Sequence, residues 1–242
     1  MGVPPTPTTV IRSIVRAVAL VVVAATASFA QSDLPLRGAA GVAIVGLAPR
    51  GEFANNVNSA WGLAGHGLFR LDQQGVVALR AELSYMVYGT EHYRVPLGAG
   101  PLGLINIDVN TTNNIINGGL GLQVVTPGVT VRPYGVATIG FSYFFTTSSA
   151  EGSNNTEPFA SSTNYSDGGL AWTVGGGLYV PVYVKRSPVN LDLGVRWVDN
   201  GRREYLRPDG ITFGDQGVSM HPVRSDAKGV QFSLGVTWVF RY

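Results

Sequence analysis

The sequence predicts an all-β fold, namely an eight-stranded antiparallel up-and-down transmembrane β-barrel. Eight runs of residues alternate between apolar and polar side chains, and a period of two indicates strands with one apolar and one polar face. The runs are about ten to fifteen residues long, which is enough to cross a bilayer at a tilt, whereas soluble strands average five or six. Short and long connections alternate between the runs, as expected when successive connections lie on opposite sides of a membrane.

The first 30 residues are typical of a secretory signal peptide. Two arginines precede a short apolar run at 17–25, and the sequence Ser-Phe-Ala at 28–30 supplies the small-x-small end of a cleavage site. The apolar run is too short for a membrane anchor, which needs about 20 residues. We therefore expect cleavage after Ala30, which leaves residues 31–242 as a single barrel domain.

The composition excludes several classes of protein. Charged residues make up 13% of the chain and Gly occurs 32 times, which fits neither a disordered tail nor an acidic soluble enzyme. The net charge is only +2 and Lys and Arg form no run, so we expect no nucleic-acid partner. The absence of cysteine excludes thiol catalysis, thiolate metal sites and disulfides.

The first four strands are expected at 38–48, 60–71, 76–88 and 111–125. The first is rich in Gly and Ala, so its facing is ambiguous. The third has the cleanest alternation, because apolar residues occupy every odd position from 77 to 87.

The last four strands are expected at 130–146, 168–184, 189–200 and 229–242. In each of them an apolar or aromatic set alternates with a set that consists largely of Gly, Ser, Thr and Asn. Small polar residues suit the narrow interior of an eight-stranded barrel.

The connections between these strands differ in length and composition. Tight turns rich in Gly or Pro are expected after residues 71, 125 and 184. Longer polar segments at 89–110, 147–167 and 201–228 are expected to be loops, with a shorter one at 49–59.

The last strand ends on an aromatic residue of its own apolar face. This face consists of alternate residues: Phe232, Leu234, Val236, Trp238, Phe240 and Tyr242. Such an end resembles the terminal strand of bacterial outer-membrane barrels, which the barrel-assembly machinery recognises. The resemblance implies that these six residues form the assembly signal, although Tyr242 stands where that family usually has Phe.

The charged residues predict which face is the lumen. A lipid-facing arginine near the bilayer midplane costs about 2–4 kcal/mol, so the polar face should point inward and the apolar face toward lipid. Four charged residues on the polar faces of two strands could then pair across the lumen: Arg80, Glu82, Asp192 and Arg196. Aromatic residues near strand ends would form interfacial girdles: Trp61, Tyr85, Tyr143, Trp197, Trp238, Phe240 and Tyr242.

The sequence also resembles the small OmpA- and OmpX-type barrel-domain family. The resemblance rests on Gly135, Gly140 and Tyr143 after the sequence Arg-Pro-Tyr at 132–134, on the 82–89 strand, and on the terminal strand. It covers essentially the whole mature chain. It implies an outer-membrane location, with short periplasmic turns and longer extracellular loops.

These observations favour a structural or surface-interaction protein whose lumen is filled by polar side chains. The alternatives are a narrow pore or hydrophobic small-molecule channel, a lipid-modifying enzyme and a soluble periplasmic barrel. His66, His92 and His221 have no catalytic or metal-binding spacing, so we expect no catalytic, cofactor or metal site. The expected partners are outer-membrane lipid and, during biogenesis, the assembly machinery, while the ligand of the loops is undetermined.

Overall fold

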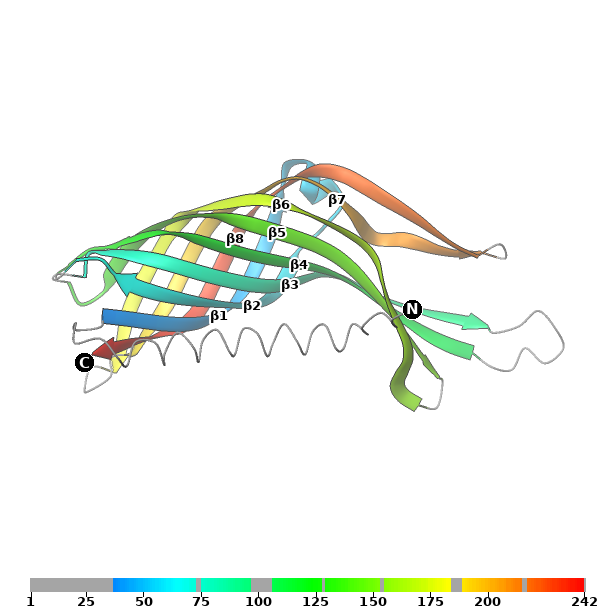
Figure 1. Ribbon diagram of the computed structural model, residues 1–242, viewed down its shortest axis with the longest axis horizontal. Coiled ribbons are helices and arrows are strands. Elements are labelled where there is room, and N and C mark those ends of the chain that lie inside the picture. The colour runs from blue at the N-terminus through cyan, green and yellow to red at the C-terminus, as the bar shows by residue number, and fades with distance from the viewer. Residues whose placement is uncertain are drawn as a thin grey trace, which may run out of the picture.

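The computed structural model shows a closed antiparallel barrel of eight strands in sequence order (Figure 1). The structure describes residues 37–72, 75–96, 106–127, 129–152, 155–183, 189–214 and 217–241. The predicted signal peptide, the 185–188 turn and Tyr242 lie outside these residues. Within the described ranges, no helix is both long and apolar enough to span a bilayer.

The first two strands are shorter than the other six, so the barrel wall is lower on one side than on the other. The bounds of the strands are β1 Arg37–Arg50, β2 Ala60–Arg70, β3 Val77–Pro96, β4 Asn106–Val125, β5 Arg132–Gly152, β6 Asn155–Tyr183, β7 Val189–Gly214 and β8 Gly217–Arg241. A 3-10 turn, η2 (Gly51–Asn55), lies between β1 and β2.

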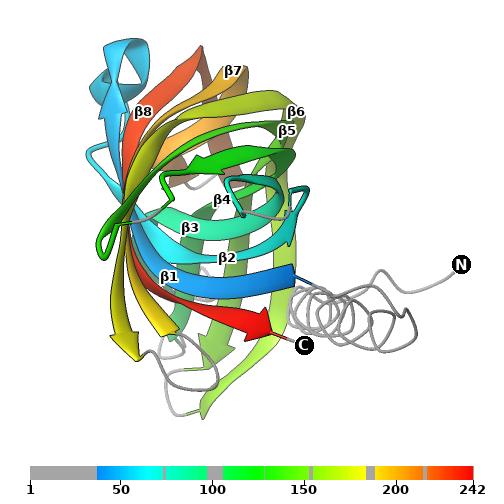
Figure 2. The ribbon, with the colours of Figure 1, turned by 90° about the vertical axis from the view of Figure 1, so that its left-hand side faces the viewer.

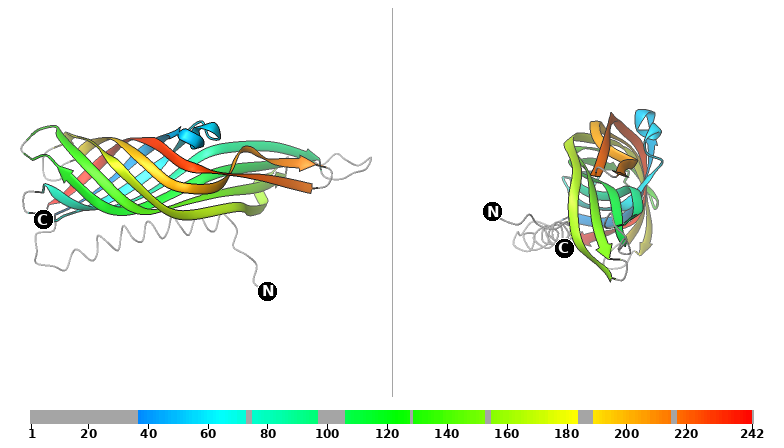
Figure 3. Two further views of the ribbon diagram at one scale, coloured as in Figure 1. Left: turned by 90° about the horizontal axis from the view of Figure 1, so that it is seen from above. Right: turned by 90° about the vertical axis from the view of Figure 1, so that its right-hand side faces the viewer.

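The first and last strands close the barrel. Arg37 lies opposite Arg241, and Arg50 lies opposite Lys228. The start of β1 and the finish of β8 lie at the same end of the barrel as the connections β2–β3, β4–β5 and β6–β7. We call this end the turn end. The opposite end is the hairpin end, from which β3–β4, β5–β6 and β7–β8 extend as paired ribbons (Figure 3).

The apolar faces of the strands point outward, as the sequence predicts. Trp61 is 65% exposed and Trp172 is 41% exposed, and the other two tryptophans also lie on the outside of the barrel. Arg80 is only 2% exposed and Arg196 only 7%, so the charged residues of the polar faces lie inside. This is the arrangement of a barrel whose outer surface contacts lipid.

The structure resolves the ambiguous facing of the first strand. Val42 and Ile44 of β1 point outward, whereas Ala43, Val45 and Leu47 are buried in the lumen. Both faces are apolar at this end of β1, because the inward side chains join an apolar cluster. The sequence pattern was ambiguous for that reason.

The prediction of long loops at 89–110, 147–167 and 201–228 is wrong for most of these residues. They continue the strands, so that Thr90 still pairs with Thr112, Ser149 with Ser161, and Thr212 with Ser219. Beyond the bilayer neither face of a ribbon meets lipid, so the apolar alternation stops while the backbone ladder continues. Irregular pairing near Thr147, Glu151, Arg202 and Ile211 further obscures the period of two.

The β2–β3 turn follows the predicted tight geometry. The carboxylate of Asp72 accepts hydrogen bonds from the backbone N–H groups of Val76 and Val77, at 3.0 and 2.8 Å. An Asp side chain that bonds backbone N–H groups further along the chain is typical of short turns.

The small lumen requires close strand packing at Gly140 of β5. A Cβ atom there would meet the backbone carbonyl of Gly118 and would lie 2.5 Å from the Cα of Gly119. Both obstacles are backbone atoms, so the two strands would have to separate.

We therefore expect Gly140→Ala to lower the free energy of unfolding by about 1–3 kcal/mol, the usual cost of overpacking. The matched control is Gly67→Ala, because a Cβ at Gly67 meets no atom within 4 Å. Urea unfolding in lipid vesicles measures both. Equal effects of the two substitutions would contradict the close packing of β4 on β5.

Candidate functional site in the barrel lumen

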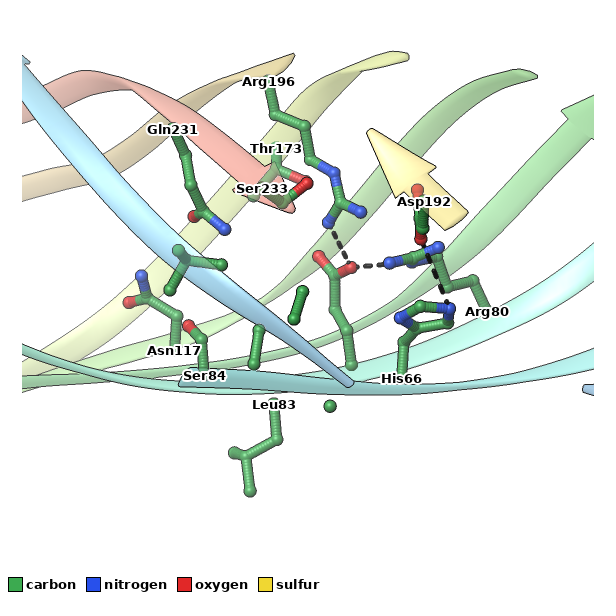
Figure 4. Close-up of a pocket in the computed structure, with 15 residues that line it drawn as sticks. His66, Arg80, Leu83, Ser84, Asn117, Thr173, Asp192, Arg196, Gln231 and Ser233 are labelled. Atoms are coloured by element: carbon green, nitrogen blue, oxygen red, sulfur yellow. Dashed lines mark hydrogen bonds and ion pairs between the residues drawn. The ribbon is translucent and has the colours of Figure 1, made fainter. Parts of the chain in front are cut away.

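A network of three charged residues occupies the middle of the lumen. Glu82 of β3 accepts hydrogen bonds from Arg80 Nε at 2.8 Å and from Arg196 Nη1 of β7 at 2.6 Å, both at Oε2. Its other oxygen, Oε1, accepts a hydrogen bond from Thr138 of β5 at 2.9 Å. Figure 4 shows Arg80 and Arg196 pointing toward this shared carboxylate. The carboxylate thus joins three strands across the barrel.

The fourth predicted charge, Asp192, does not join this network. Its Oδ1 accepts a hydrogen bond from Tyr134 at 2.7 Å, and its Oδ2 lies 3.4 Å from Thr237 Oγ1 and 3.8 Å from His66 Nε2 (Figure 4). His66 is buried on the lumen face of β2, beside this carboxylate. The four charged residues therefore form two adjacent groups. Arg80, Glu82 and Arg196 form one group with a net positive charge, and Asp192 with its polar neighbours forms the other.

The turn end of the lumen is filled by a layer of tyrosines and amides. Tyr134 and Tyr179 stack with ring centroids 4.6 Å apart. Gln123 donates to the hydroxyl of Tyr179 at 3.0 Å and accepts from Arg80 Nη1 at 2.6 Å. Gln123 thereby connects this layer to the central charges, so the two layers form one hydrogen-bonded unit.

The hairpin end of the lumen contains an apolar cluster that the sequence analysis missed. Its strand-borne members are Ala43, Val45, Leu47, Ala60, Met86, Tyr88, Ile115, Phe144, Val198, Tyr205 and Ala227. A signal was present in the sequence, since Met86, Ile115 and Phe144 are large apolar residues on otherwise polar faces. We call the part of the lumen that these residues surround, together with the side chains of Phe53 and Val57 that fill it, the outer chamber.

Two segments of the chain close the outer chamber. The 3-10 turn η2 packs against β8, as Figure 2 shows at the rim of the barrel, and the connection it belongs to places the buried side chains of Phe53 and Val57 inside. On the other side, β7 near Leu206 crosses the open end of the barrel. There the hydroxyl of Tyr88 donates a hydrogen bond to the carbonyl oxygen of Leu206 at 2.9 Å. β3 and β7 are not neighbours in the wall, so this hydrogen bond crosses the opening.

Little space remains in the middle of the lumen. The cavity beside the central charges has a volume of about 30 Å³, and Asn117 and Arg196 line it. A second cavity of about 30 Å³ lies near the turn end, beside Gln123 and Tyr179. Each has room for only one or two water molecules.

The ribbon β3–β4 carries charged pairs beyond the barrel. Arg94 Nε donates to Asp108 Oδ1 at 2.9 Å, and His92 Nε2 lies 3.5 Å from the same oxygen. The hydrogen bond and positive charge of Arg94 hold the pKa of the Asp108 carboxyl below its ordinary value. This carboxylate stays ionised in mildly acidic water, and its pairing with Arg94 is lost only as the pH falls through the lowered pKa.

The described residues of the predicted assembly signal form the outward face of β8. Phe232, Leu234, Trp238 and Phe240 are large apolar side chains exposed on the outside of the barrel. Tyr85, Tyr143 and Trp197 of the expected girdles are also on the outside, and Tyr85 donates a hydrogen bond to Asn114 Oδ1 at 2.6 Å. Tyr242, the last residue of both sets, lies outside the described residues.

The described residues contain no group of three or more His, Cys, Asp or Glu side chains arranged to hold a metal ion. His66 has both a hydroxyl and a carboxylate nearby, and it is buried among Thr237, Asp192 and the central charges.

The comparisons with solved structures find small outer-membrane barrels. The chain is similar to OprG from Pseudomonas aeruginosa, with 14% identity and a TM-score of 0.46 over 86% of this chain and 97% of that one. It is also similar to Ail, the attachment invasion locus protein of Yersinia pestis, with 12% identity and a TM-score of 0.43 over 86% of this chain and 100% of that one. A search of the curated proteins found no match.

The family comparison covers almost the whole chain. The model of the outer membrane protein beta-barrel domain matches residues 17–240. Together with the outward apolar faces, this match excludes the soluble barrel and places the protein in the bacterial outer membrane. The chain belongs to the outer membrane protein beta-barrel domain family.

Proposed function

We propose that this outer-membrane protein has a structural and surface-interaction role, as a sealed barrel that displays its three long ribbons outside the cell. The observation that carries the proposal is the filling of the lumen by three successive layers. These are the tyrosine and amide layer, the central charges, and the apolar cluster closed by η2 and β7.

The central charges support a seal because residues from several strands of the wall hold them in place. A permeating ion would have to displace Arg80 and Arg196 from Glu82, while each arginine is attached to a different strand of the wall. Separating buried ion pairs without replacement partners is costly. The outer apolar cluster adds a second barrier, since an ion gains no hydration there.

The proposal has an electrical test. Purified protein in planar bilayers is expected to give no steady single-channel steps. Steady steps that disappear when Arg80 or Arg196 is replaced would instead identify a narrow pore through the central network. The arginine replacements thus separate conduction through the lumen from leakage around the protein.

We infer that residues 1–30 direct export and are removed, and that the assembly machinery reads the outward face of β8 with Tyr242. The first residues of β4 and the last residues of β5 carry side-chain hydroxyls that hydrogen-bond with one another. Thr112 and Thr147, for example, are 2.9 Å apart. Such surfaces suit adaptable polar contacts with a partner, and we propose no catalytic, cofactor or metal site.

A further inference from the structure

The outer chamber is an apolar part of the lumen, next to a middle layer that is largely polar and charged. Its walls come from seven of the eight strands, including Met86 of β3, Ile115 of β4 and Phe144 of β5. A seal alone does not require this composition, because the hydrogen-bonded layers below already fill the lumen. Apolar pockets lined by aromatic and aliphatic side chains are typical of sites for small apolar ligands.

One aromatic ring of the chamber does not come from a strand of the wall. Phe53 comes from η2, in the connection between β1 and β2, and it is 0% exposed. Its ring makes edge-to-face contacts with Tyr205 and Phe144, at centroid distances of 5.4 and 6.0 Å. The connection 51–59, which we call the tether, therefore holds the ring of Phe53 inside the chamber.

The tether is held to the barrel by few polar contacts. Glu52 accepts a hydrogen bond from the backbone N–H of Asp226 at 3.1 Å, at an exposed position, and the side chain of Asn56 hydrogen-bonds with Tyr205. No side chain caps the start of η2. Gly51 has a φ of +60°, and a Cβ there would meet nothing within 4 Å, so the first residue of the turn has open space around it. Glycine reaches this conformation and others at little steric cost.

The wall of the barrel is lowest where the tether lies. The last pair of β1 with β8 is Arg50 with Lys228, and the β2–β3 pairing reaches no further than Trp61 with Val87. The neighbouring strands β8 and β3 continue beyond these pairs. η2 lies at the rim beside this low part of the wall (Figure 2), and its residues belong to no strand pair, so it can move outward without breaking one.

We propose that the outer chamber is a binding site for one small apolar aromatic molecule, and that Phe53 occupies this site until the molecule displaces it together with η2. The bound molecule takes over the ring contacts with Tyr205 and Phe144 that Phe53 gives up. A ligand shifts such an equilibrium by its greater affinity for the open form. The central charges lie below the chamber, so binding does not require conduction, and the proposal stands apart from the role of the ribbons.

The test uses the absence of cysteine from the chain. Val57→Cys places the single thiol at a position that is 2% exposed, just after η2. We expect toluene to increase the rate at which a water-soluble maleimide modifies this thiol by at least tenfold, with a saturable dependence on toluene concentration. Full-length protein in lipid vesicles is used throughout.

Two control variants identify where the opening occurs. Ser84→Cys reports on the buried middle of the lumen, and its thiol should stay protected with and without toluene. Ser59→Cys places a thiol at an exposed position of the same connection, and its rate should not change. The proposal would be overturned if toluene did not change the modification rate of Val57→Cys. It would also be overturned if the rate of Ser84→Cys rose in parallel, because toluene would then be loosening the whole barrel.

A second measurement decides the question if Val57→Cys fails to fold. Phe53→Ala removes the tethered competitor, so its affinity for toluene, measured by calorimetry, should be at least tenfold higher than that of the unmodified protein. Phe69→Ala removes a ring from the lipid face and should leave the affinity unchanged. Equal affinities of Phe53→Ala and the unmodified protein would show that Phe53 does not occupy the site.

Discussion

Replacement of Glu82 by alanine is expected to lower the free energy of unfolding by about 3–5 kcal/mol, the cost of removing one partner from a buried charge network. Two guanidinium groups, those of Arg80 and Arg196, would then face each other without the carboxylate that lies 2.8 and 2.6 Å from them. The hydroxyl of Thr138 would lose an acceptor as well. Glu82 is thus the residue on which the middle layer depends.

The measurement is urea unfolding in lipid vesicles, followed by tryptophan fluorescence. The matched control is Glu52→Gln, because Glu52 is exposed and its carboxylate accepts a hydrogen bond from a backbone N–H that lies at the surface. Its effect should stay within about 0.5 kcal/mol. A double variant that also removes Arg196 should recover part of the loss, since one unpaired charge disappears. If Glu82→Ala were as stable as Glu52→Gln, the charges would not hold the lumen together.

Replacement of Ile139 by arginine is expected to lower the free energy of unfolding by about 2–4 kcal/mol, the cost of a lipid-facing arginine near the bilayer midplane. Ile139 lies midway along the barrel part of β5, pairs with Leu120 and Trp172, and is 59% exposed on the outside. On a soluble protein the same exposed position would accept arginine almost without cost. The size of the effect therefore reports on the surroundings of the outer face.

His92→Arg provides the comparison outside the bilayer. His92 is exposed on the part of β3 that extends beyond the barrel, so the added charge remains in water and the effect should be within about 0.5 kcal/mol. Both variants are unfolded with urea in vesicles of the same lipid. Equal tolerance of arginine at Ile139 and His92 would show that the outer face of β5 does not contact acyl chains.

The strands inside the bilayer were predictable because two solvents act on their two faces. In the 76–88 segment, lipid selects apolar residues such as Leu79 and Tyr85, while the lumen selects Arg80 and Glu82. The same contrast ends where the ribbons leave the membrane. Around Thr112 and Thr147 polar residues occupy both faces of the sheet, so the sequence shows no period of two although the pairing continues.

The candidate site was predictable only in part. The sequence identified the four inward charges, because a charge on a membrane strand must avoid lipid. It could not show that Asp192 bonds to Tyr134 rather than to an arginine, because that choice depends on the register of β7 against β5 across the lumen. It also missed Phe53, because a single phenylalanine in a connection carries no periodic signal.

The sequence by itself determined that this protein is an eight-stranded barrel with its apolar faces toward lipid, because alternation along each strand is a local property that the two solvents impose directly. Only the tertiary structure decided how the lumen is filled. Closure of the barrel sets which side chains from distant strands meet, such as Glu82 with Arg196, and the low wall at β1 and β2 lets η2 insert Phe53. These contacts depend on stagger and strand length, which no single segment encodes.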